Sequence, residues 1–318
     1  ILLNKIGTKL FKLMKRSTSD ISSKKENILE RYALPKEINK SSEYPPFSVA
    51  ICVYGKDNPE WFDMALASII NQTVKPSEIV LVIDGPIPYE VQQVINKYAE
   101  LCRAKEILSN VIRFTQNKGL GEALRVAVES CSNELIARMD SDDIAVSNRF
   151  ELQINRFMKN DIDICGGQIE EFINTPTNVV GKRIVPETDE ELKIYMKKRC
   201  PFNHVTVMYR KTAVLDAGNY IDWFCNEDYY LWIRMALKNL RFANVSETIV
   251  NVRVGNDMYA RRGGSKYYKS EVGLQRLMLE KGIIDKPTYM MNCAKRFIVQ
   301  RMMPNKVRGW VFKKFARS

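Results

Sequence analysis

The feature of this sequence that most constrains its fold is the alternation of short apolar runs with longer helical patterns between residues 47 and 140. Each run is short enough for a buried strand, and the segment after it places apolar residues at helical spacing. Strands that alternate with helices form βαβ units and a mainly parallel sheet. The strands predicted in this half are FSVAICVYG (47–55), EIVLVI (78–83), NVIRFT (110–115) and ELIARMD (134–140).

The segments between these runs carry helix signals. Pro59 follows Asp57 and Asn58, and proline is favoured at the first position of a helix. Further helices are expected over residues 88–105 and from Gly119 onwards. The sequence therefore predicts the α/β fold class, with a Rossmann-like, mainly parallel sheet and helices on both faces.

After about residue 160 the alternation loosens into an α+β texture that decorates the first half. Strands are expected there at 161–173, 179–185, 204–210 and 241–254, and helices at 188–199, 228–238 and 266–303.

The composition is that of an ordinary globular protein. Of the 318 residues 45% are hydrophobic and 27% charged, which excludes a mostly disordered, collagen-like or coiled-coil chain. The longest run without a charged residue has 12 residues, whereas a transmembrane helix needs about 18. Seven cysteines form no CxxC pair, which argues against a disulfide framework or a cysteine zinc site and fits a reducing cytosol. The single histidine, His204, excludes a multi-histidine metal site, and no GxSxG motif supports a serine hydrolase.

The net charge of +12 lies at the two ends of the chain. Residues 1–16 carry +5 and residues 286–318 carry +9, which leaves −2 for residues 17–285. Basic amphipathic helices lie on anionic membranes, where each basic residue contributes about 1 kcal/mol. An anionic membrane surface is therefore the predicted partner of the ends; packing against the folded domain is the alternative, and no fold signature favours nucleic acid. The apolar stripes of the two ends are Leu3, Ile6, Leu10 and Leu13, and Val307, Trp310, Val311 and Phe315.

The strongest chemical signal is the run Asp140-Ser141-Asp142-Asp143, directly after a predicted strand. Open α/β sheets bind ligands at the carboxyl ends of their strands. Clustered carboxylates repel each other unless a cation neutralises them, and Mg²⁺ or Mn²⁺ is commonly shared between carboxylates and substrate phosphates. We therefore expect a metal site here; a solvated acidic loop that caps the next helix is the alternative.

Two weaker signals lie earlier in the chain. Asp84 ends the strand at 78–83, where an acid either forms a turn or accepts hydrogen bonds from a base or ribose. The turn Asn117-Lys118-Gly119 leads into a helix, and it is either a simple helix start or a phosphate site.

In this order, these pieces resemble the family-2 glycosyltransferases of the GT-A fold over about residues 47–255. The longer stretch is similar to bacterial members from exopolysaccharide and capsule biosynthesis, such as those of amylovoran. The pieces that carry the resemblance are SVAICVYG (48–55), SIINQT (68–73), EIVLVIDG (78–85), NKGLGEAL (117–124), ARMDSDD (137–143), NRFELQ (148–153), PFNHVTVMYRK (201–211), NEDYYLWIR (226–234) and RRGG (261–264).

The resemblance implies a role for each matching residue. Asp84 would contact the uracil or ribose of a UDP-sugar, and Asp228 would be the catalytic base. Asp140 and Asp142 would be the DxD motif that holds Mn²⁺ or Mg²⁺, with Asp142 the direct ligand. The other residues assigned to substrate binding are Val53, Tyr54, Asn117, Lys118, Gly119, Arg138, Asp140, His204, Glu227, Trp232, Arg261 and Arg262.

Two residues depart from the family pattern, and several have a structural alternative. Gly55 and Arg125 stand where many members have asparagine, which bears on the fit of the donor. The alternatives are a helix-start acid for Asp228, a core position for His204, helix packing for Trp232 and a solvated loop for Arg261 and Arg262.

The sequence thus predicts an inverting, metal-dependent glycosyltransferase that moves a hexose from a UDP-sugar to a lipid-linked saccharide, as a peripheral protein at the cytoplasmic face of the cell membrane. Such a transfer needs a carboxylate to take the acceptor proton and a metal to offset charge on the leaving diphosphate. The rivals are a sugar-phosphate nucleotidyltransferase, whose glycine-rich signature is missing here, and a membrane-associated binding protein of the same fold. The expected parts are a basic N-terminal helix and linker (1–46), a nucleotide-sugar half (47–160), an acceptor half (161–265) and a basic helical extension (266–318).

Overall fold

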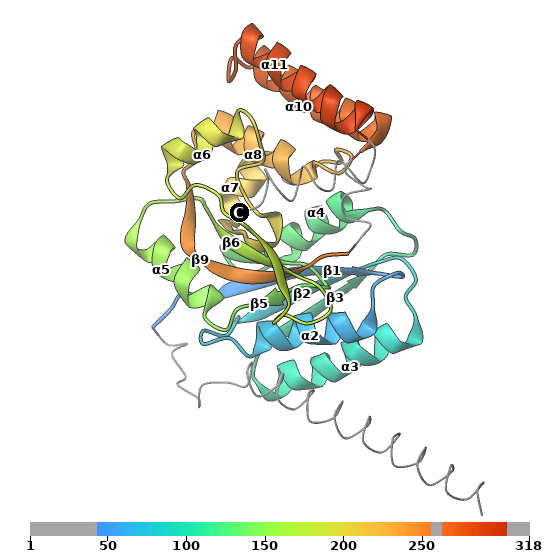
Figure 1. The fold of residues 1–318 in the computed structure, drawn as a ribbon. Coiled ribbons are helices and arrows are strands. Elements are labelled where there is room, and N and C mark those ends of the chain that lie inside the picture. The colour runs from blue at the N-terminus through green and yellow to red at the C-terminus, as the bar shows by residue number, and fades with distance from the viewer. Residues whose placement is uncertain (1–42, 256–262, 304–318) are drawn as a thin grey trace, which may run out of the picture. The chain divides into compact units, whose positions relative to one another are not determined.

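The computed structural model describes residues 43–255 and 263–303 (Figure 1). The predicted N-terminal amphipathic helix, the pair Arg261 and Arg262, and the apolar stripe around Trp310 lie outside these residues. Within the described ranges, no helix combines the length and the apolar character that a membrane crossing requires.

One nine-stranded sheet organises the part of the chain that the structure describes. The strand order is β3-β2-β1-β4-β8-β6-β9-β5, with β7 paired to β6. β1 pairs in parallel with β2 and β4, and β2 pairs in parallel with β3, so the βαβ arrangement predicted for the first half is confirmed. The strands are β1 (Phe47–Tyr54), β2 (Glu78–Asp84), β3 (Leu108–Arg113), β4 (Leu135–Met139), β5 (Ile144–Ala145), β6 (Ile164–Phe172), β7 (Val179–Arg183), β8 (Met208–Arg210) and β9 (Phe242–Arg253).

Helices cover both faces of this sheet, as the sequence predicts. Side chains alternate along a strand, so Val49 and Ile51 of β1 join one core while Ala50 joins the other. α2, α3 and α5 pack on the first face, and α4, α6, α7 and α8 pack on the second (Figure 1). The helices are α2 (Pro59–Ile70), α3 (Tyr89–Ala104), α4 (Leu120–Ser130), α5 (Arg149–Lys159), α6 (Asp189–Met196), α7 (Lys211–Asp216) and α8 (Glu227–Leu237).

The second half of the sheet is mixed. β8 runs antiparallel to both β4 and β6, whereas β6 and β9 are parallel. The strand predicted at 204–210 is only partly correct, because His204–Thr206 form a 3₁₀ turn and only Met208–Arg210 pair as a strand. The two-residue strand β5 and the six-residue helix α7 were not predicted, since neither is long enough to show a period.

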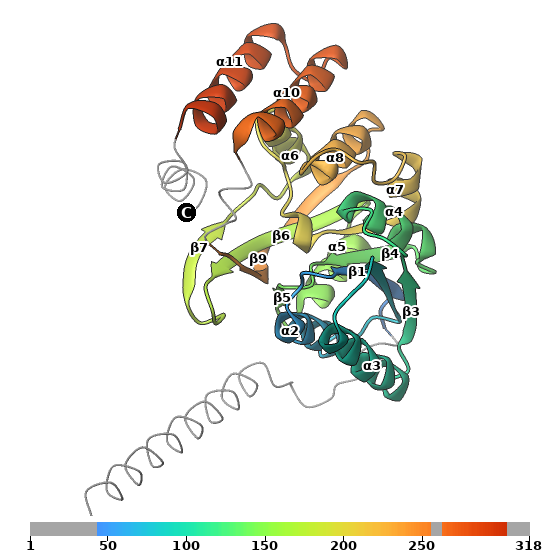
Figure 2. The same cartoon turned by 90° about the vertical axis from the view of Figure 1, so that its right-hand side faces the viewer.

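Two further helices, α10 (Gly264–Glu280) and α11 (Lys286–Phe297), lie side by side (Figures 1 and 2). A π-helical turn, Ile298–Met302, continues α11. Leu274 and Met278 of α10 belong to the same core as α6 and α8. The helices predicted over 266–303 are therefore confirmed.

Candidate active site

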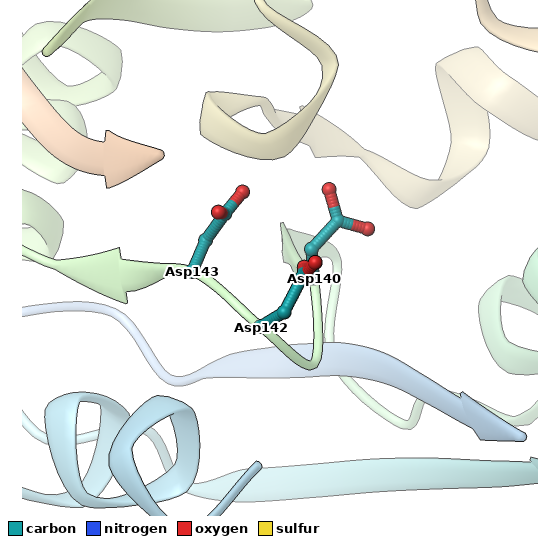
Figure 3. A group of neighbouring side chains, drawn as sticks. All are labelled: Asp140, Asp142 and Asp143. Atoms are coloured by element: carbon teal, nitrogen blue, oxygen red, sulfur yellow. The ribbon is translucent and has the colours of Figure 1, made fainter. Parts of the chain in front are cut away.

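The acidic run lies on the loop between β4 and β5, at the carboxyl end of β4 (Figure 3). Asp140, Asp142 and Asp143 each place a carboxylate oxygen within 4.8 Å of the others. β1, β2 and β4 are parallel, so their carboxyl ends meet at this edge of the sheet. The structure thus gathers the three acids where an open α/β sheet binds its ligand.

Asp140 is held by a buried arginine from β4. The guanidinium of Arg138 donates twice to it, over 2.5 Å from Nη2 to Oδ1 and 2.7 Å from Nη1 to Oδ2. Nε of Arg138 has no hydrogen-bond partner among the described residues. Arg149 of α5, also fully buried, donates to the carbonyl oxygen of Arg138 over 2.7 Å and so fixes the end of β4. Both oxygens of Asp140 are therefore already engaged.

The other two acids of the loop are less well compensated. Oδ1 of the buried Asp143 accepts the backbone N–H of Arg253 over 2.7 Å, and no neighbouring side chain described in the structure donates to the carboxylate of Asp142. Burial, then the charges of Asp140 and Asp57, raise the pKa of Asp142 to about 6, and burial also raises the pKa of Asp143. Closely spaced oxygen donors that repel each other in this way fit Mg²⁺ or Mn²⁺, with Asp142 the most available ligand.

Asp57 joins the site although the sequence analysis placed it only at a helix start. Its Oδ2 accepts the N–H of Tyr54 over 3.0 Å and the hydroxyl of Ser141 over 2.8 Å. Asp57 thereby ties the end of β1 to the acidic loop, and burial raises its pKa. Of the two substrate-binding residues predicted on β1, Tyr54 is partly exposed, but the side chain of Val53 lies in the core, so Val53 offers only its backbone.

Asp84 closes the turn at 117–119, for which phosphate binding was one of the two interpretations. Its carboxylate accepts the N–H groups of Lys118 and Gly119, over 2.6 and 3.0 Å, and its carbonyl oxygen accepts the side-chain amide of Asn117 over 3.2 Å. Because those N–H groups point at Asp84, they are not free for a phosphate, and the helix-start interpretation is the one that the geometry supports. A carboxylate has about four acceptor positions, so the predicted contact of Asp84 with a base or ribose remains compatible.

The two departures from the family pattern have different surroundings. A Cβ added to Gly55 would lie 2.6 Å from the carbonyl oxygen of Pro86, so glycine lets the loop after β2 come close to the end of β1. Arg125 forms ion pairs with Glu122 and Glu129 along α4. Of the two, Gly55 is the one that shapes the sheet edge.

The pair Glu227 and Asp228 begins helix α8. Burial, then the charge of Asp228, raises the pKa of Glu227 to about 7, and burial raises the pKa of Asp228. Sγ of Cys200 lies 3.5 Å from Oδ2 of Asp228 and donates to it. A carboxylate whose pKa is raised takes up a proton more readily, which suits a general base.

One buried cation connects this pair with the acidic loop. Besides pairing with Asp140, the charge of Arg138 opposes the rise in the pKa of Asp142, Glu227 and Asp228. The charge of Asp140 also acts on Glu227. A Cβ added to Gly121, in the first turn of α4, would lie 3.7 Å from Cβ of Glu227. The start of α8 therefore lies beside the turn that Asp84 closes, at the same edge of the sheet as the acidic loop.

His204 and Trp232 have the surroundings of structural residues. Nε2 of His204 lies 2.9 Å from the hydroxyl oxygen of Tyr220, and burial holds the pKa of its imidazole well below the usual range. Trp232 is fully buried, with its ring edge-on to those of Phe202 and His204. The prediction that Trp232 stacks on substrate is wrong, because its indole is enclosed by the core; helix packing was the correct alternative.

An α/β domain with an acidic loop at the carboxyl end of β4 and a half-buried carboxylate pair at the same sheet edge has the architecture of the GT-A transferases. The sequence matches the family model "Glycosyl transferase family 2" over residues 48–221. The chain therefore belongs to glycosyltransferase family 2, as the motifs predict.

This chain aligns with nearly the whole length of several relatives. An uncharacterized glycosyltransferase of Haemophilus influenzae is 36% identical over 86% of this chain and 99% of its own. The amylovoran biosynthesis glycosyltransferase AmsE of Erwinia amylovora is 34% identical over 84% and 98%. The UDP-Gal:alpha-D-GlcNAc-diphosphoundecaprenol beta-1,3-galactosyltransferase of Escherichia coli is 33% identical over 87% and 98%.

Solved structures share the fold at low identity. TarS 1–349 of S. aureus, in complex with UDP-GlcNAc, superposes with a TM-score of 0.59 at 17% identity, covering 80% of this chain and 72% of TarS 1–349. The mannosyltransferase PcManGT of Pyrobaculum calidifontis, with GDP-Man and Mn²⁺, gives a TM-score of 0.57 at 12% identity, covering 90% and 84%. Both confirm the predicted GT-A fold.

Proposed function

We propose that this glycosyltransferase is a metal-dependent, inverting enzyme that moves a hexose from a UDP-sugar to a lipid-linked saccharide during the synthesis of a cell-surface polysaccharide. The observation that carries the proposal is that two carboxylate groups, distant in the sequence, lie at one edge of the sheet: the acidic loop after β4, and the start of α8 beside the first turn of α4. The names of the Escherichia coli and Erwinia amylovora relatives support the donor, the lipid-linked acceptor and the pathway class.

On the acceptor side, Asp228 removes the proton from the attacking hydroxyl group. The oxygen forms a bond to the anomeric carbon while the bond from that carbon to the diphosphate oxygen breaks, and the electron pair leaves with UDP. The proton ends on Asp228, whose raised pKa favours its uptake. A single displacement inverts the configuration, so an α-linked donor gives a β-linked product.

On the donor side, Asp142, with Asp143 and Asp140, would hold the divalent cation, which when bound offsets the negative charge of the departing diphosphate. Arg138 keeps Asp140 in place through its bidentate contact. Asp84 fixes the turn at 117–119 and would accept a hydrogen bond from the uracil or ribose.

The enzyme would meet its acceptor as a peripheral protein at the cytoplasmic face of the membrane. The charge distribution supports this location, because residues 1–16 and 286–318 together carry fourteen basic residues and no acid. Anionic lipid attracts such segments.

The test is UDP release by the full chain with Mn²⁺, a panel of UDP-sugars and diphosphate-linked saccharide acceptors, followed by NMR of the product linkage. Acceptor-dependent UDP release with a β-linkage from an α-linked donor is the expected result. Release of inorganic pyrophosphate from a nucleoside triphosphate would instead identify a nucleotidyltransferase. Tight UDP-sugar binding without turnover on any acceptor would identify a binding protein, and an α-linked product would exclude the single displacement.

A further inference from the structure

The helix α11 and its π-helical continuation turn apolar side chains away from the domain. Met290 is 68% exposed and Met302 is 66% exposed, and the three other large apolar residues of this surface are between 43% and 48% exposed. An ordinary surface helix points such residues inward and its polar residues outward. We call this surface the α11 outer face; it consists of Met290, Met291, Phe297, Ile298 and Met302.

The opposite side of α11 is what fastens it to the domain. The side-chain amide of Asn292 donates to the carbonyl oxygen of Lys197 over 2.9 Å. Arg296, one turn later, donates over 2.5 Å to Glu271 of α10 and over 3.0 Å to the carbonyl oxygen of Lys198. Both ionic partners of that contact are nearly buried. The helix is therefore held by these polar contacts and by Tyr289, which packs against the core, while the ring of Phe297 also meets that of Tyr268 of α10 edge-on. The methionines of the outer face take no part in these contacts.

We propose that the α11 outer face is the surface through which this enzyme docks on an anionic lipid bilayer. The inference rests on the proposed function, which places the enzyme at a membrane, and it names the surface that makes the contact. Apolar side chains of such a helix enter the boundary between head groups and acyl chains, while basic residues beside them meet the anionic head groups. Methionine suits this role because its flexible side chain adapts to an irregular apolar phase.

Charge decides between a bilayer and a second copy of the chain. Lys295 and Arg301 are exposed beside the outer face, and Lys286 is exposed at the start of the helix. Residues 304–318, which follow directly in the sequence, add five basic residues and no acid. Pairing two copies through this face would bring these positive charges together, whereas an anionic surface neutralises them.

The same helix pair is attached to the segment that leads into the catalytic base. Nε1 of Trp223 donates to the carbonyl oxygen of Ser270 in α10 over 3.1 Å, and the side-chain amide of Asn226 donates to the hydroxyl oxygen of Ser270 over 3.0 Å. Asn226 immediately precedes Glu227 and Asp228. Docking through α11 therefore holds the acceptor side of the site at the membrane, where a lipid-linked acceptor is found.

The experiment measures sedimentation of the full chain with vesicles of phosphatidylcholine alone or mixed with phosphatidylglycerol. The variant Met290→Gln with Met291→Gln keeps every charge and uses a good helix former at exposed positions. We expect its partitioning onto the mixed vesicles to fall about tenfold or more, because two inserted apolar side chains are lost. The matched control, Tyr89→Gln with Met158→Gln, changes two apolar residues that are at least as exposed on α3 and α5, and its binding should stay at the parent level.

UDP release with a water-soluble acceptor separates this proposal from the proposed function. The α11 variant should retain that activity; loss of vesicle binding with activity intact supports the docking surface. Parent-level vesicle binding by the folded double variant overturns it, as does a parent dimer that becomes a monomer in the variant, since the face would then be a protein interface. Met302→Gln alone, which lies beyond α11, gives the same test if the double variant does not fold.

Discussion

The two carboxylate groups of the site are built in opposite ways. In the acidic loop, Asp140 is neutralised by two bonds from Arg138 and Asp143 receives a backbone N–H, while three carboxylates crowd within 4.8 Å. At the start of α8, Asp228 has a backbone hydrogen bond at Tyr229, and its side-chain donor among the described residues is the thiol of Cys200; Glu227 lies beside it. A thiol stabilises an ionised carboxylate less than a guanidinium does. The first arrangement is suited to attracting a cation, and the second to taking up a proton.

The largest effect should come from removing the proton acceptor. We expect Asp228→Asn to lower kcat by about 10²–10⁴-fold, the usual cost of losing a general base, while UDP-sugar affinity in Mn²⁺ stays unchanged. Turnover assays and calorimetric titration with the donor measure the two quantities. Asp63→Asn, at the surface of α2, is the matched control and should behave like the parent. A crippled Glu227→Gln beside an active Asp228→Asn would mean that the wrong carboxylate of the pair has been assigned.

A smaller effect is expected when the acidic loop is changed, and it should appear in the affinity for UDP. Asp142→Asn should remove the gain in UDP affinity that Mn²⁺ provides, with a loss of about tenfold or more, because even residues outside the direct ligand set cost that much in metal sites. Titrations with Mn²⁺ and with EDTA measure the gain. Circular dichroism should show an intact fold, since the carboxylate of Asp142 holds no other described side chain. Full Mn²⁺-dependent affinity in this variant would refute the metal assignment.

The activity should also depend on pH. The base acts when deprotonated, so kcat/KM should fall as the pH drops through the raised pKa of Asp228. Burial and the charge of Asp228 raise the pKa of Glu227 to about 7, so Glu227 is still protonated when Asp228 ionises, and Glu227→Gln should leave the acidic limb in place. Cys200, Arg138 and Arg183 also face Asp228 and stay unchanged in this variant. An acidic limb that moves to lower pH in this variant would show that Glu227 ionises before Asp228.

The locally periodic parts of the chain could be predicted from the sequence. The strands β1 to β4 and the helices between them follow from patterns of a few residues, and the acidic loop follows from its position after one of these strands. Asp57 was missed as a site residue because its contact with Ser141 depends on which strands become neighbours. Pairing between β1 and β4, which are distant in the sequence, is not visible in local spacing.

At two other places in the chain, the sequence pattern is compatible with two different local structures. A tryptophan one turn after Asp228 fits a substrate face and a core face equally, and only the packing around Trp232 decides between them. The N–H groups of Lys118 and Gly119 suit a phosphate or a carboxylate, and Asp84 takes them. In both cases the deciding partner comes from another element of the fold.

The smallest expected effect concerns the thiol beside the base. The guanidinium of Arg183 donates to the carbonyl oxygens of Cys200 and Phe202, over 2.7 and 3.3 Å, and so fixes the loop that carries the thiol. Burial raises the pKa of Cys200, which keeps the thiol protonated, and its Sγ lies 3.5 Å from both Asp228 and the carbonyl oxygen of Phe202. The thiol is therefore a weak, shared donor that helps the base to ionise.

Cys200→Ala removes this donor and should raise the pKa of Asp228, so the acidic limb of kcat/KM moves to higher pH and activity on that side falls about two- to tenfold, the range for one hydrogen bond. Cys200→Ser supplies a stronger donor and should move the limb the opposite way. A pH profile separates this from a packing effect, because a packing defect lowers activity at every pH without shifting the limb. Cys102→Ala, at a buried cysteine of α3 remote from the acids, is the matched control and should leave the profile in place. Identical acidic limbs in the alanine, serine and parent enzymes would mean that Asp228 owes its proton affinity to burial and its charged neighbours alone.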